Sequence, residues 1–389
     1  MKKIVFISDF FVDQIAGGGE ICDNVLMSLF RDDGYRIAKF NSHLTSDNHI
    51  KLYRKCGYKF IISNFCNLHE QAKQELVKYP GSYSIMEHDH KYLRTRDPSV
   101  FKDFKAPNSQ IVNRIFYANA KAIFAQSKLH KEVIEKNLGI SNVVNLGMNL
   151  WTDEQLAIIE TNLQNEKVDD YSIVNSDNPT KNTQACVQYC EEKGLSYTLI
   201  KSPDYASFIK QLSQHEKYLY FPKVLETFNR VIIEARMLNC KVNTTANNGC
   251  LSEDWFKKYK GKELIEFVRE QRQRVFYDIK EAIYKERLST AGDSDITVIL
   301  NAYRRPYNLE MQIAAIRNQT IKPKQIWLWV NAHEDNEGFD FKSLDVDRVF
   351  HNDFNWKFYG RFAGSLLADT EYLALFDDDT IPGSKWLEN

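Results

Sequence analysis

The 389-residue sequence lacks several features that mark special classes of protein. Its formal net charge is only -1, from 51 basic and 52 acidic residues, so strong non-specific binding to nucleic acid is not expected. No stretch approaches 18 consecutive apolar residues, so no transmembrane helix is predicted. The apolar run within residues 1–9 is too short for the core of a signal peptide. We therefore expect a cytoplasmic protein without a nucleic-acid partner.

The seven cysteines do not form a recognisable disulfide or metal-binding pattern, because none shows Cys-x-x-Cys spacing. An odd, scattered set favours free thiols in a reducing compartment. Cys186 and Cys190 lie four residues apart on an expected helix. We interpret them as residues that pack on one helix face, and a metal-binding pair is the alternative.

The pattern that dominates the sequence is the alternation of short apolar runs with amphipathic stretches. Hydrophobic residues make up 43% and charged residues 26%, as in an ordinary globular protein. The alternation predicts an α/β architecture with parallel sheets. The expected strands are 3–8, 36–40, 58–63, 82–86, 121–125, 142–145, 171–175, 196–200, 217–221, 240–245, 296–301, 325–330, 347–350 and 372–376.

The strands fall into three series, which predict the domain organisation. Residues 1–150 and 151–288 are expected to form two Rossmann-like domains. A short polar stretch at 289–294 follows and is expected to be a linker, because its residues are small. Residues 295–389 begin a third α/β domain, which we expect to be truncated at its C-terminus. A natural stop, with the partial domain used for binding or docking, is the alternative.

A long charged helix is expected over residues 253–288, with its apolar residues at helical spacing. Ten basic and six acidic residues lie between Lys257 and Arg287. We interpret the stretch as a solvated helix that packs by one apolar stripe. Peripheral contact with an anionic membrane surface, at the inner membrane face, is the alternative.

The first candidate ligand-binding motif is Gly17-Gly18-Gly19-Glu20, which lies between the first strand and an amphipathic helix. Glycines there allow a close approach to the backbone, and a helix N-terminus offers free N–H groups to an anion. The motif is not the dinucleotide-binding Gly-x-Gly-x-x-Gly pattern. A flexible turn without a ligand is the alternative.

The second motif contains Glu226 and Glu234, which follow the expected strand 217–221. A carboxylate at a buried helix start can accept two hydrogen bonds from the vicinal diol of a ribose. A carboxylate in the preceding loop can hold a second polyol. Surface or capping roles for these residues remain the alternative.

Residues 1 to about 285 resemble a GT-B glycosyltransferase, close to glycosyltransferase family 4. Four segments carry the resemblance: 17–20, 87–89, 178–182 and 226–234. The resemblance implies a UDP- or GDP-sugar donor held mainly by the second domain. It also implies retention of anomeric configuration and no metal requirement in this half, with the acceptor on the side of the first domain.

The resemblance also implies roles for individual residues. Glu234 would hold the donor ribose, Glu226 would face the donor sugar, and Lys181 would contact the diphosphate. His88 would lie near the donor sugar. The other residues implied in donor binding are Gly18, Gly19, Phe228 and Arg230.

The sequence departs from the family pattern at three places. Thr227 and Asn229 stand where the family usually has glycine, which restricts the backbone. The usual phosphate-binding arginine is absent from residues 175–180, and Arg230 is a candidate replacement. In addition, His88 and His90 would share a face of an extended segment, so a metal site or a structural role is an alternative there.

The third motif is Asp377-Asp378-Asp379, directly after the expected strand 372–376. Paired carboxylates suit a divalent cation that also binds a diphosphate. Together with 296–305 and 317–320 the motif resembles the start of a GT-A glycosyltransferase of family 2. This implies that Asp377 and Asp379 hold ribose and Mn²⁺ or Mg²⁺, and that Ala302 and Tyr303 line a nucleotide pocket.

Two features limit what the third domain is expected to do. The family's catalytic base lies downstream of its Asp-x-Asp motif, beyond the end of this sequence, and Asn331 stands where an acidic nucleotide-binding residue is often found. A phosphatase of the Asp-x-Asp-x-Thr type fits poorly, because Ile381 stands where threonine or valine is needed.

Taken together, the motifs predict a glycosyltransferase of the hexosyltransferase type that acts through residues 1–285. The acceptor would be a glycan, a lipid-linked molecule or a protein. Three alternatives stay open: a bifunctional protein with two transferase units, a non-catalytic nucleotide-sugar-binding scaffold, and a redox enzyme of the Rossmann class.

Overall fold

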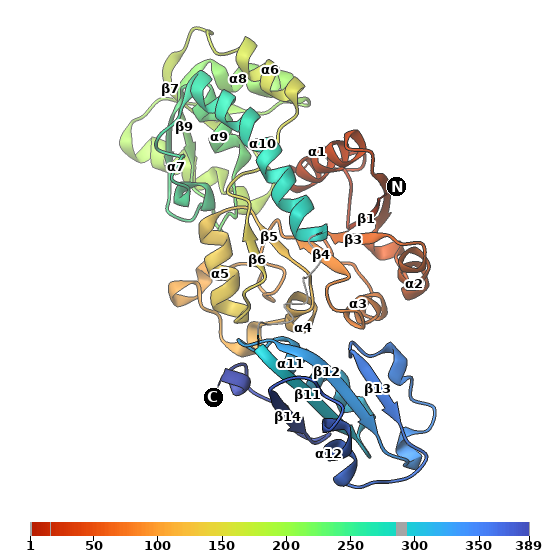
Figure 1. Ribbon diagram of the computed structural model, residues 1–389. Helices are drawn as coiled ribbons and strands as arrows, with labels where there is room; N and C mark the ends of the chain where they lie inside the picture. Colours follow the sequence, from red (N-terminus) through yellow and green to blue (C-terminus); the bar gives the residue numbers. More distant parts are fainter. Residues whose placement is uncertain (1, 16, 285–293, 389) are drawn as a thin grey trace. The chain divides into compact units, whose positions relative to one another are not determined.

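A computed structural model describes residues 2–15, 17–284 and 294–388, and the chain divides into two compact units, Met1–Tyr284 and Lys285–Asn389 (Figure 1). Both units are α/β, and every strand pairing in the described residues is parallel, as predicted. The expected linker 289–294 lies outside the described residues except for Ser294, which begins a strand.

The first sheet of unit one has six strands in the order β2-β1-β3-β4-β5-β6. Its core strands are buried on both sides, which suits a parallel sheet between helical layers. The strands are β1 (Lys3–Ser8), β2 (Arg36–Asn41), β3 (Lys59–Ile62), β4 (Tyr83–Met86), β5 (Ile123–Ala125) and β6 (Val143–Asn145). The helices are α1 (Gly18–Asp32), α2 (Asp47–Lys55), α3 (Glu70–Val77), α4 (Arg114–Ala118) and α5 (Lys128–Leu138).

The second sheet of unit one has four strands in the order β10-β9-β7-β8. The strands are β7 (Val168–Val174), β8 (Tyr197–Ile200), β9 (His215–Tyr220) and β10 (Lys241–Thr244). The helices are α6 (Asp153–Thr161), α7 (Thr183–Lys193), α8 (Tyr205–Ser213), α9 (Arg230–Met237) and α10 (Gly261–Tyr284).

Each sheet of unit one has one point where the strand order reverses. In the first sheet the chain leaves β1 for β2 on one side and returns to β3 on the other. In the second sheet the same reversal separates β7 from β9. The crevice beyond the carboxyl ends of such strands is where open α/β sheets bind ligands. The topology therefore gives two candidate positions for a ligand.

The two sheets of unit one share a hydrophobic core, and residues 1–284 form one compact unit. The expected division of this unit into two domains near residue 150 stays a prediction. The core includes residues from β1 and α1 together with residues from α6, α9 and α10. Phe30 on α1 meets Phe276 on α10 edge to face, with ring centroids 5.0 Å apart, and the two helices lie side by side in Figure 1. Lys280 on α10 also pairs with Asp33 at the end of α1.

Helix α10 begins at Gly261, eight residues later than the sequence analysis expected. The missing part, residues 253–260, forms a bend and turns that follow a short 3-10 helix at Gly249–Ser252. The Glu253 carboxylate accepts a hydrogen bond from the Lys128 backbone N–H (2.7 Å), and the Trp255 indole donates to the Gly147 carbonyl (2.9 Å). These tertiary contacts hold the segment against the first sheet and prevent an earlier helix start.

Unit two contains one four-stranded sheet in the order β13-β12-β11-β14. The strands are β11 (Ser294–Ala302), β12 (Pro323–Val330), β13 (Arg348–His351) and β14 (Tyr372–Phe376), and the helices are α11 (Leu309–Arg317) and α12 (Tyr359–Ser365). Gly360 and Gly364 let α12 approach the Trp329 ring, since a Cβ at Gly360 would clash with the indole. The strand order reverses between β11 and β14.

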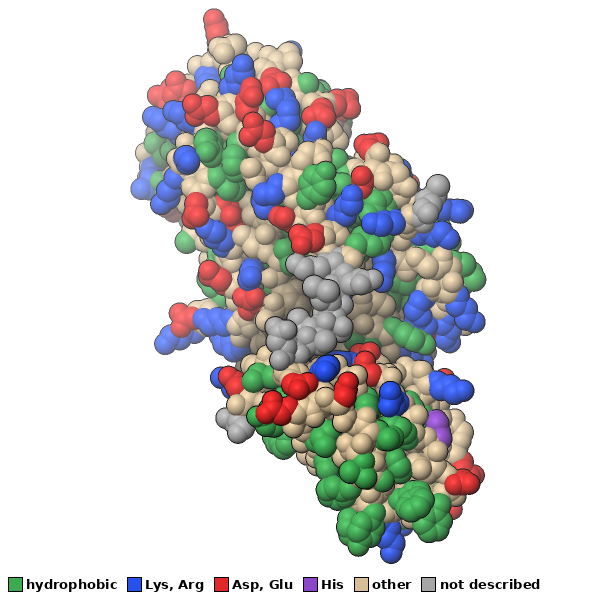
Figure 2. All heavy atoms as spheres, in the orientation of Figure 1, with side chains coloured by type: hydrophobic (Ala, Val, Ile, Leu, Met, Phe, Trp, Pro, Cys, Tyr) green, Lys and Arg blue, Asp and Glu red, His purple; other side chains and the backbone are tan. Residues whose placement is uncertain are grey.

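Two surface properties bear on expectations about membranes. Among the residues that the structure describes, no helix has the length and apolar character needed to cross a bilayer. Acidic and basic side chains are interspersed over the face of unit one in Figure 2. The contact of α10 with an anionic membrane stays an untested alternative.

Candidate functional site

A cavity of about 100 Å³ lies at the reversal point of the second sheet, between the carboxyl ends of β7 and β9. It is smaller than the roughly 300–1,000 Å³ typical of small-molecule pockets. Its polar lining comes from the loops after both strands and from the start of α9. The lining residues with oxygen- or nitrogen-bearing side chains are Ser176, Lys181, Thr183, Tyr218, Tyr220 and Asn229.

Lys181 lines this cavity and is in contact with Glu226, a second residue to which the resemblance gave a role in donor binding. Lys181 Nζ lies 2.8 Å from Glu226 Oε1, and their side chains are 37% and 15% exposed. The Tyr220 hydroxyl donates a hydrogen bond to the same oxygen. Glu226 is thus held through one oxygen by two donors, and the ammonium group of Lys181 is paired with a carboxylate.

The two residues that replace the family's glycines each have a structural function here. The Asn229 side chain caps α9 by accepting a hydrogen bond from the Ile232 N–H (3.0 Å). The Thr227 hydroxyl lies 2.8 Å from the His88 carbonyl oxygen and 2.8 Å from Gln126 Oε1. Thr227 and Asn229 therefore both stabilise the loop before α9, and Thr227 also connects this loop to residues that follow strands of the first sheet.

Glu234 is buried, and protein partners occupy one of its oxygens. Oε1 accepts hydrogen bonds from the Trp151 indole (2.9 Å) and the Tyr205 hydroxyl (3.0 Å), and Arg230 Nη2 lies 3.8 Å away. Arg230 also stacks over the Trp151 ring at 4.3 Å and donates to the Leu150 carbonyl. Glu234 lines neither of the two cavities described here, so its predicted contact with a ribose stays a prediction.

A second cavity, of about 360 Å³, lies at the reversal point of the first sheet, between β1 and β3. This volume is within the range of small-molecule sites. The lining comes from the loops after β1, β3 and β4 and from the start of α1. It comprises Asp9, Phe10, Gly19, Glu20, Asn64, Cys66, Asn67, His88, Asp89 and Arg96.

His88 lies at the edge of this larger cavity with both ring nitrogens engaged. Nε2 is 2.9 Å from Asp23 Oδ1, and Gln126 Nε2 is 2.8 Å from Nδ1. Burial alone would lower the pKa of His88, but the charge of Asp23 and its hydrogen bond outweigh burial and raise the pKa above its usual value. The imidazole is therefore fixed in orientation by two protein groups.

The glycine loop serves close packing within the protein. A Cβ at Gly19 would lie 3.1 Å from the His88 ring, and one at Gly18 would lie 3.5 Å from Arg230 Cδ. The glycines thus bring the N-terminus of α1 against His88 and Arg230. The Phe228 side chain lies in the core next to Trp255, with ring centroids 6.2 Å apart, and its expected role in donor binding stays a prediction.

The two histidines of the segment 87–90 do not act as a pair. His90 is buried, with Nδ1 2.9 Å from the Tyr92 hydroxyl, whereas His88 contacts Asp23 and Gln126. Burial lowers the pKa of His90 to about 4, which keeps it neutral. The described residues contain no group of three or more metal-ligating side chains, so the structure gives the metal alternative no support there.

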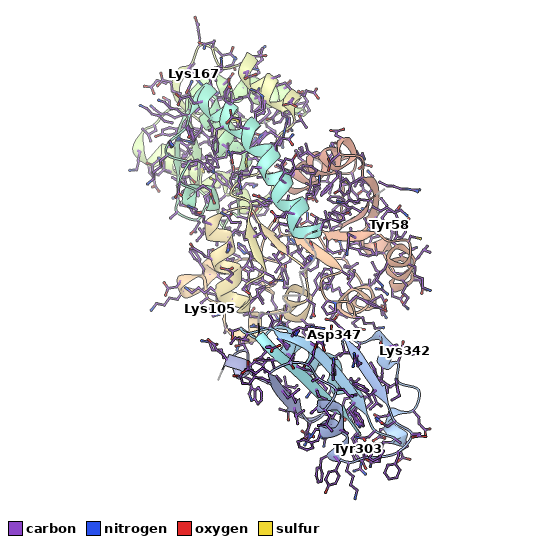
Figure 3. All side chains as sticks on the ribbon, viewed as in Figure 1. Tyr58, Lys105, Lys167, Tyr303, Lys342 and Asp347 are labelled. Atoms are coloured by element: carbon purple, nitrogen blue, oxygen red, sulfur yellow. The ribbon has the colours of Figure 1, made fainter. Side chains whose placement is uncertain are left out.

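In unit two the aspartate motif follows β14 at the reversal point next to β11. The middle residue, Asp378, is buried, and its Oδ2 accepts backbone N–H groups of Tyr303 (3.2 Å), Arg304 (2.8 Å) and Arg305 (3.2 Å). Asp378 therefore shapes the loop after β11. Figure 3 shows Tyr303 at the end of this sheet opposite Asp347, as the parallel order requires.

The outer aspartates are more exposed and each pairs with an arginine. Asp377 is 52% exposed and pairs with Arg361, and Asp379 is 58% exposed and lies 2.9 Å from Arg305 Nη1. A divalent cation with a bound diphosphate needs only one or two protein carboxylates. The pair therefore has the donor chemistry for Mn²⁺ or Mg²⁺, provided that the arginines turn to the phosphates.

The other expected nucleotide contacts of unit two have protein partners. Ala302 is fully buried, and the Tyr303 ring packs edge to face on His333 with centroids 4.8 Å apart. Asn331 is buried and donates to Asn301 Oδ1 (2.9 Å). A neutral amide at this position avoids a buried charge beside Asn301.

The sequence analysis missed several residues that build the site in unit one. Asp23, Gln126 and Tyr220 hold His88 and Glu226, and Asp9 and Asn64 line the larger cavity. Asp9 directly follows β1 and Asn64 lies two residues after β3, so their positions at strand ends could have been used to predict them. No sequence pattern indicated Asp23 and Gln126, because each contacts His88 from a distant part of the chain.

Comparison with known proteins returns solved structures only. No protein-family model matches the chain, and no curated protein matches it. HepE (Alr3699) of Anabaena, solved with UDP and glucose, is 13% identical with a TM-score of 0.39, and the match covers 73% of this chain and 92% of that one. A glycosyltransferase of Rickettsia africae is 12% identical with a TM-score of 0.42, covering 73% and 99%. An α-glucosyltransferase solved with UDP and a 13-mer DNA is 11% identical with a TM-score of 0.39, covering 74% and 96%.

Proposed function

We propose that this protein is a glycosyltransferase that takes its sugar from a nucleotide donor bound at the β7/β9 cavity of unit one. The observation that carries the proposal is the contact of Lys181, Glu226 and Tyr220 at the reversal point of the second sheet. That position suits a nucleotide, a lysine suits a diphosphate, and a carboxylate suits sugar hydroxyls.

The proposed reaction uses the protein mainly to position the donor and to stabilise charge. The bond from the sugar C1 to the phosphate oxygen breaks, and the acceptor hydroxyl oxygen forms a new bond to C1. The proton of that hydroxyl goes to the leaving phosphate oxygen. Negative charge develops on the diphosphate, and Lys181 would stabilise it in the transition state. We propose retention of configuration, with no metal needed in unit one.

Glu226 would have two successive partners in this scheme. Without donor it pairs with Lys181. When the diphosphate binds, the ammonium group would turn to the phosphates, and Glu226 would keep its hydrogen bond from Tyr220 and accept sugar hydroxyls. The small volume of the cavity agrees with a site that opens as this ion pair separates.

Release of free nucleotide from a panel of UDP-, GDP-, ADP- and CMP-sugars tests the proposal, with glycans, lipid-linked sugars and proteins as acceptors. We expect release with at least one donor, at least 100-fold lower in Lys181→Met and in Glu226→Gln. Glu216→Gln is the matched control, because Glu216 is exposed near the opposite end of β9. Absence of release with every donor, together with absence of nucleotide binding, would overturn the proposal.

A non-catalytic nucleotide-sugar-binding protein is the second candidate. It is favoured by the engagement of both ring nitrogens of His88, which leaves the imidazole without a free group for a substrate. This candidate predicts nucleotide-sugar binding without turnover. The same panel separates the two functions.

For unit two we propose a nucleotide–metal site in which Asp377 and Asp379 hold Mn²⁺ or Mg²⁺. The support is their position at the β11/β14 reversal point and the two arginines beside them. A bound cation would supply charge that neutralises a diphosphate. With this site the chain would belong to a bifunctional transferase.

A further inference from the structure

Exposed large hydrophobic side chains are concentrated in unit two. Of the 23 that the described residues carry, 13 belong to residues 294–388, which are about a quarter of the described chain. Six of these 13 lie close together in the sequence and are each 49–87% exposed: Phe354, Trp356, Phe358, Tyr359, Phe362 and Leu366. We call these six residues the α12 surface.

Helix α12 turns its large apolar residues away from its own sheet. Its glycines, Gly360 and Gly364, lie against a buried tryptophan ring of β12. Tyr359, Phe362 and Leu366 are exposed and follow the spacing i, i+3 and i+7, which places them on one side of the helix. A surface helix normally buries such a stripe against the core and exposes polar residues. In α12 the small residues pack inward, and the apolar stripe is exposed.

The loop before α12 extends the same patch. The Phe354 and Trp356 rings contact each other with centroids 5.5 Å apart, and Phe358 packs on Tyr359 at 4.2 Å. The loop backbone is anchored, because the Trp356 N–H donates to Asn331 Oδ1 (3.0 Å) and the Tyr359 N–H donates to the Trp356 carbonyl (3.1 Å). Figure 2 shows hydrophobic side chains gathered on unit two around the place where Figure 1 labels α12. A contiguous exposed apolar patch marks an interaction surface.

The charged side chains within this patch are basic. Between residues 354 and 368 the only charged residues are Lys357 and Arg361, and the neighbouring acidic residues lie outside this run. Lys357 is exposed and has no ion-pair partner among the residues that the structure describes. Arg361 pairs with Asp377, and its guanidinium lies 5.7 Å from the centroid of the Phe362 ring. The patch therefore combines aromatic rings with positive charge and has no acidic group of its own.

This combination fits the surface of an anionic lipid bilayer. Aromatic side chains, tryptophan and tyrosine above all, are enriched at the level of the lipid headgroups. A helix with an exposed apolar stripe can lie in the plane of this interface, and lysine and arginine beside it are attracted to anionic headgroups. The bilayer thus offers an apolar layer for the rings and negative charge for the cations.

A second copy of the chain is a poorer complement. A two-fold contact would place the same patch on both sides of the interface. The cations of one copy would then face those of the other, and neither patch contains a carboxylate to neutralise them. The charges therefore favour the bilayer over a homodimer.

We propose that the α12 surface binds the headgroup region of an anionic lipid bilayer, with α12 lying in the plane of the membrane surface. Lys357 would contact lipid phosphates, and the exposed rings would enter the interface. Arg361 connects this surface to Asp377, so membrane binding would hold the aspartate motif beside the headgroups. Unit two would then act on an acceptor carried by a lipid, and this last step alone rests on the proposed function.

Co-sedimentation of the full chain with lipid vesicles tests the inference. The vesicles consist of phosphatidylcholine alone, or of equal parts of phosphatidylcholine and phosphatidylglycerol. We expect binding to the anionic vesicles to be at least about tenfold stronger, since each cation near the surface contributes about fivefold. Lys357→Gln should weaken binding to the anionic vesicles about fivefold. Phe362→Ala and Leu366→Ala should each weaken it about tenfold, because they remove apolar surface from the interface.

Met311→Ala is the matched control, because Met311 is 55% exposed on α11 in the same unit. The two helices cover opposite faces of the sheet: α11 shares a core with Val298 and Leu300, whereas Gly364 of α12 lies near Ile299. Vesicle binding of Met311→Ala should equal that of the wild type. The unfolding temperature of each variant checks that it is folded.

The inference is overturned if the chain binds neither kind of vesicle, if it binds both equally, or if Phe362→Ala and Leu366→Ala bind like the wild type. Sedimentation equilibrium without lipid identifies the competing partner. A dimer that Phe362→Ala dissociates, in a chain that binds no vesicles, would assign the surface to a second copy. No nucleotide is present in these assays, so membrane binding and the proposed transferase activity succeed or fail separately.

Discussion

Replacement of Glu226 by glutamine has an unusual predicted signature, because it should strengthen nucleotide binding while it removes turnover. In the free protein Glu226 pairs with Lys181, and this contact has to break before the ammonium group can meet a diphosphate. Glutamine keeps the shape and the acceptor for the Tyr220 hydroxyl but removes the charge. The ion pair then no longer opposes binding.

The magnitude follows from the exposure of the pair. The Lys181 side chain is 37% exposed, so the ion pair contributes about 0.5–1 kcal/mol. Its loss should lower the dissociation constant of the nucleoside diphosphate about two- to fivefold. Lys181→Met removes a charge-assisted hydrogen bond of about 1.5–3 kcal/mol and should weaken binding about 10- to 150-fold.

Isothermal titration with UDP, GDP and ADP measures both effects on the full chain, with Glu216→Gln as the control. The two variants should move the dissociation constant in opposite directions. Weaker nucleotide binding in Glu226→Gln, or unchanged binding in Lys181→Met, would refute the reasoning that the pair masks a phosphate site.

Three further predictions concern stability. Gly249→Ala should lower the free energy of unfolding by about 1–3 kcal/mol, because the added Cβ would clash with the Thr227 carbonyl and Ser127 Oγ. Gly383→Ala is the control, because a Cβ at Gly383 would point into open space, and it should leave the thermal melt unchanged. Asp378→Ala should lower the free energy of unfolding by about 2–4 kcal/mol, because three loop N–H groups would lose their acceptor. Asp379→Ala should change the free energy of unfolding by no more than about 0.5 kcal/mol. Equal urea midpoints for the two variants would contradict the buried role of Asp378. The effect of Asp23→Asn on the free energy of unfolding should depend on pH, because Asp23 raises the pKa of His88. The stabilisation by this pair is complete below about pH 6.5 and is lost as the pH rises through the pKa of His88 in the folded protein. The stability difference from the wild type should therefore be larger at pH 5.5 than at pH 8.5, and a difference that grows with pH would exclude this pairing.

The sequence predicted the strands well because their signal is local. Each expected strand is present within a few residues, since buried parallel strands are short apolar runs between turn residues. The predicted start of α10 was wrong, because residues in the segment 253–260 form hydrogen bonds with Lys128 and Gly147. Both partners lie more than a hundred residues earlier in the chain. Helical periodicity carries no information about such contacts.

The candidate site was predictable where residues follow strand ends. Lys181 and Glu226 follow β7 and β9, whose carboxyl ends are neighbours in the sheet, so their contact follows from topology. The surroundings of Glu234 were not predictable, because Trp151 and Tyr205 reach it from separate segments. Phe228 was assigned by resemblance alone, and its place in the core depends on Trp255.

The most direct test of the central claim is the thermal stability of the full chain with UDP-, GDP-, ADP- and CMP-sugars, each with and without Mn²⁺. A donor at about 100 times its dissociation constant adds roughly 2.7 kcal/mol to the stability of the unit that binds it. The account predicts stabilisation by at least one donor without metal, unchanged in Asp379→Asn and reduced by half or more in Lys181→Met. Stabilisation that requires Mn²⁺, persists in Lys181→Met and disappears in Asp379→Asn would place the working donor site in unit two and contradict the account.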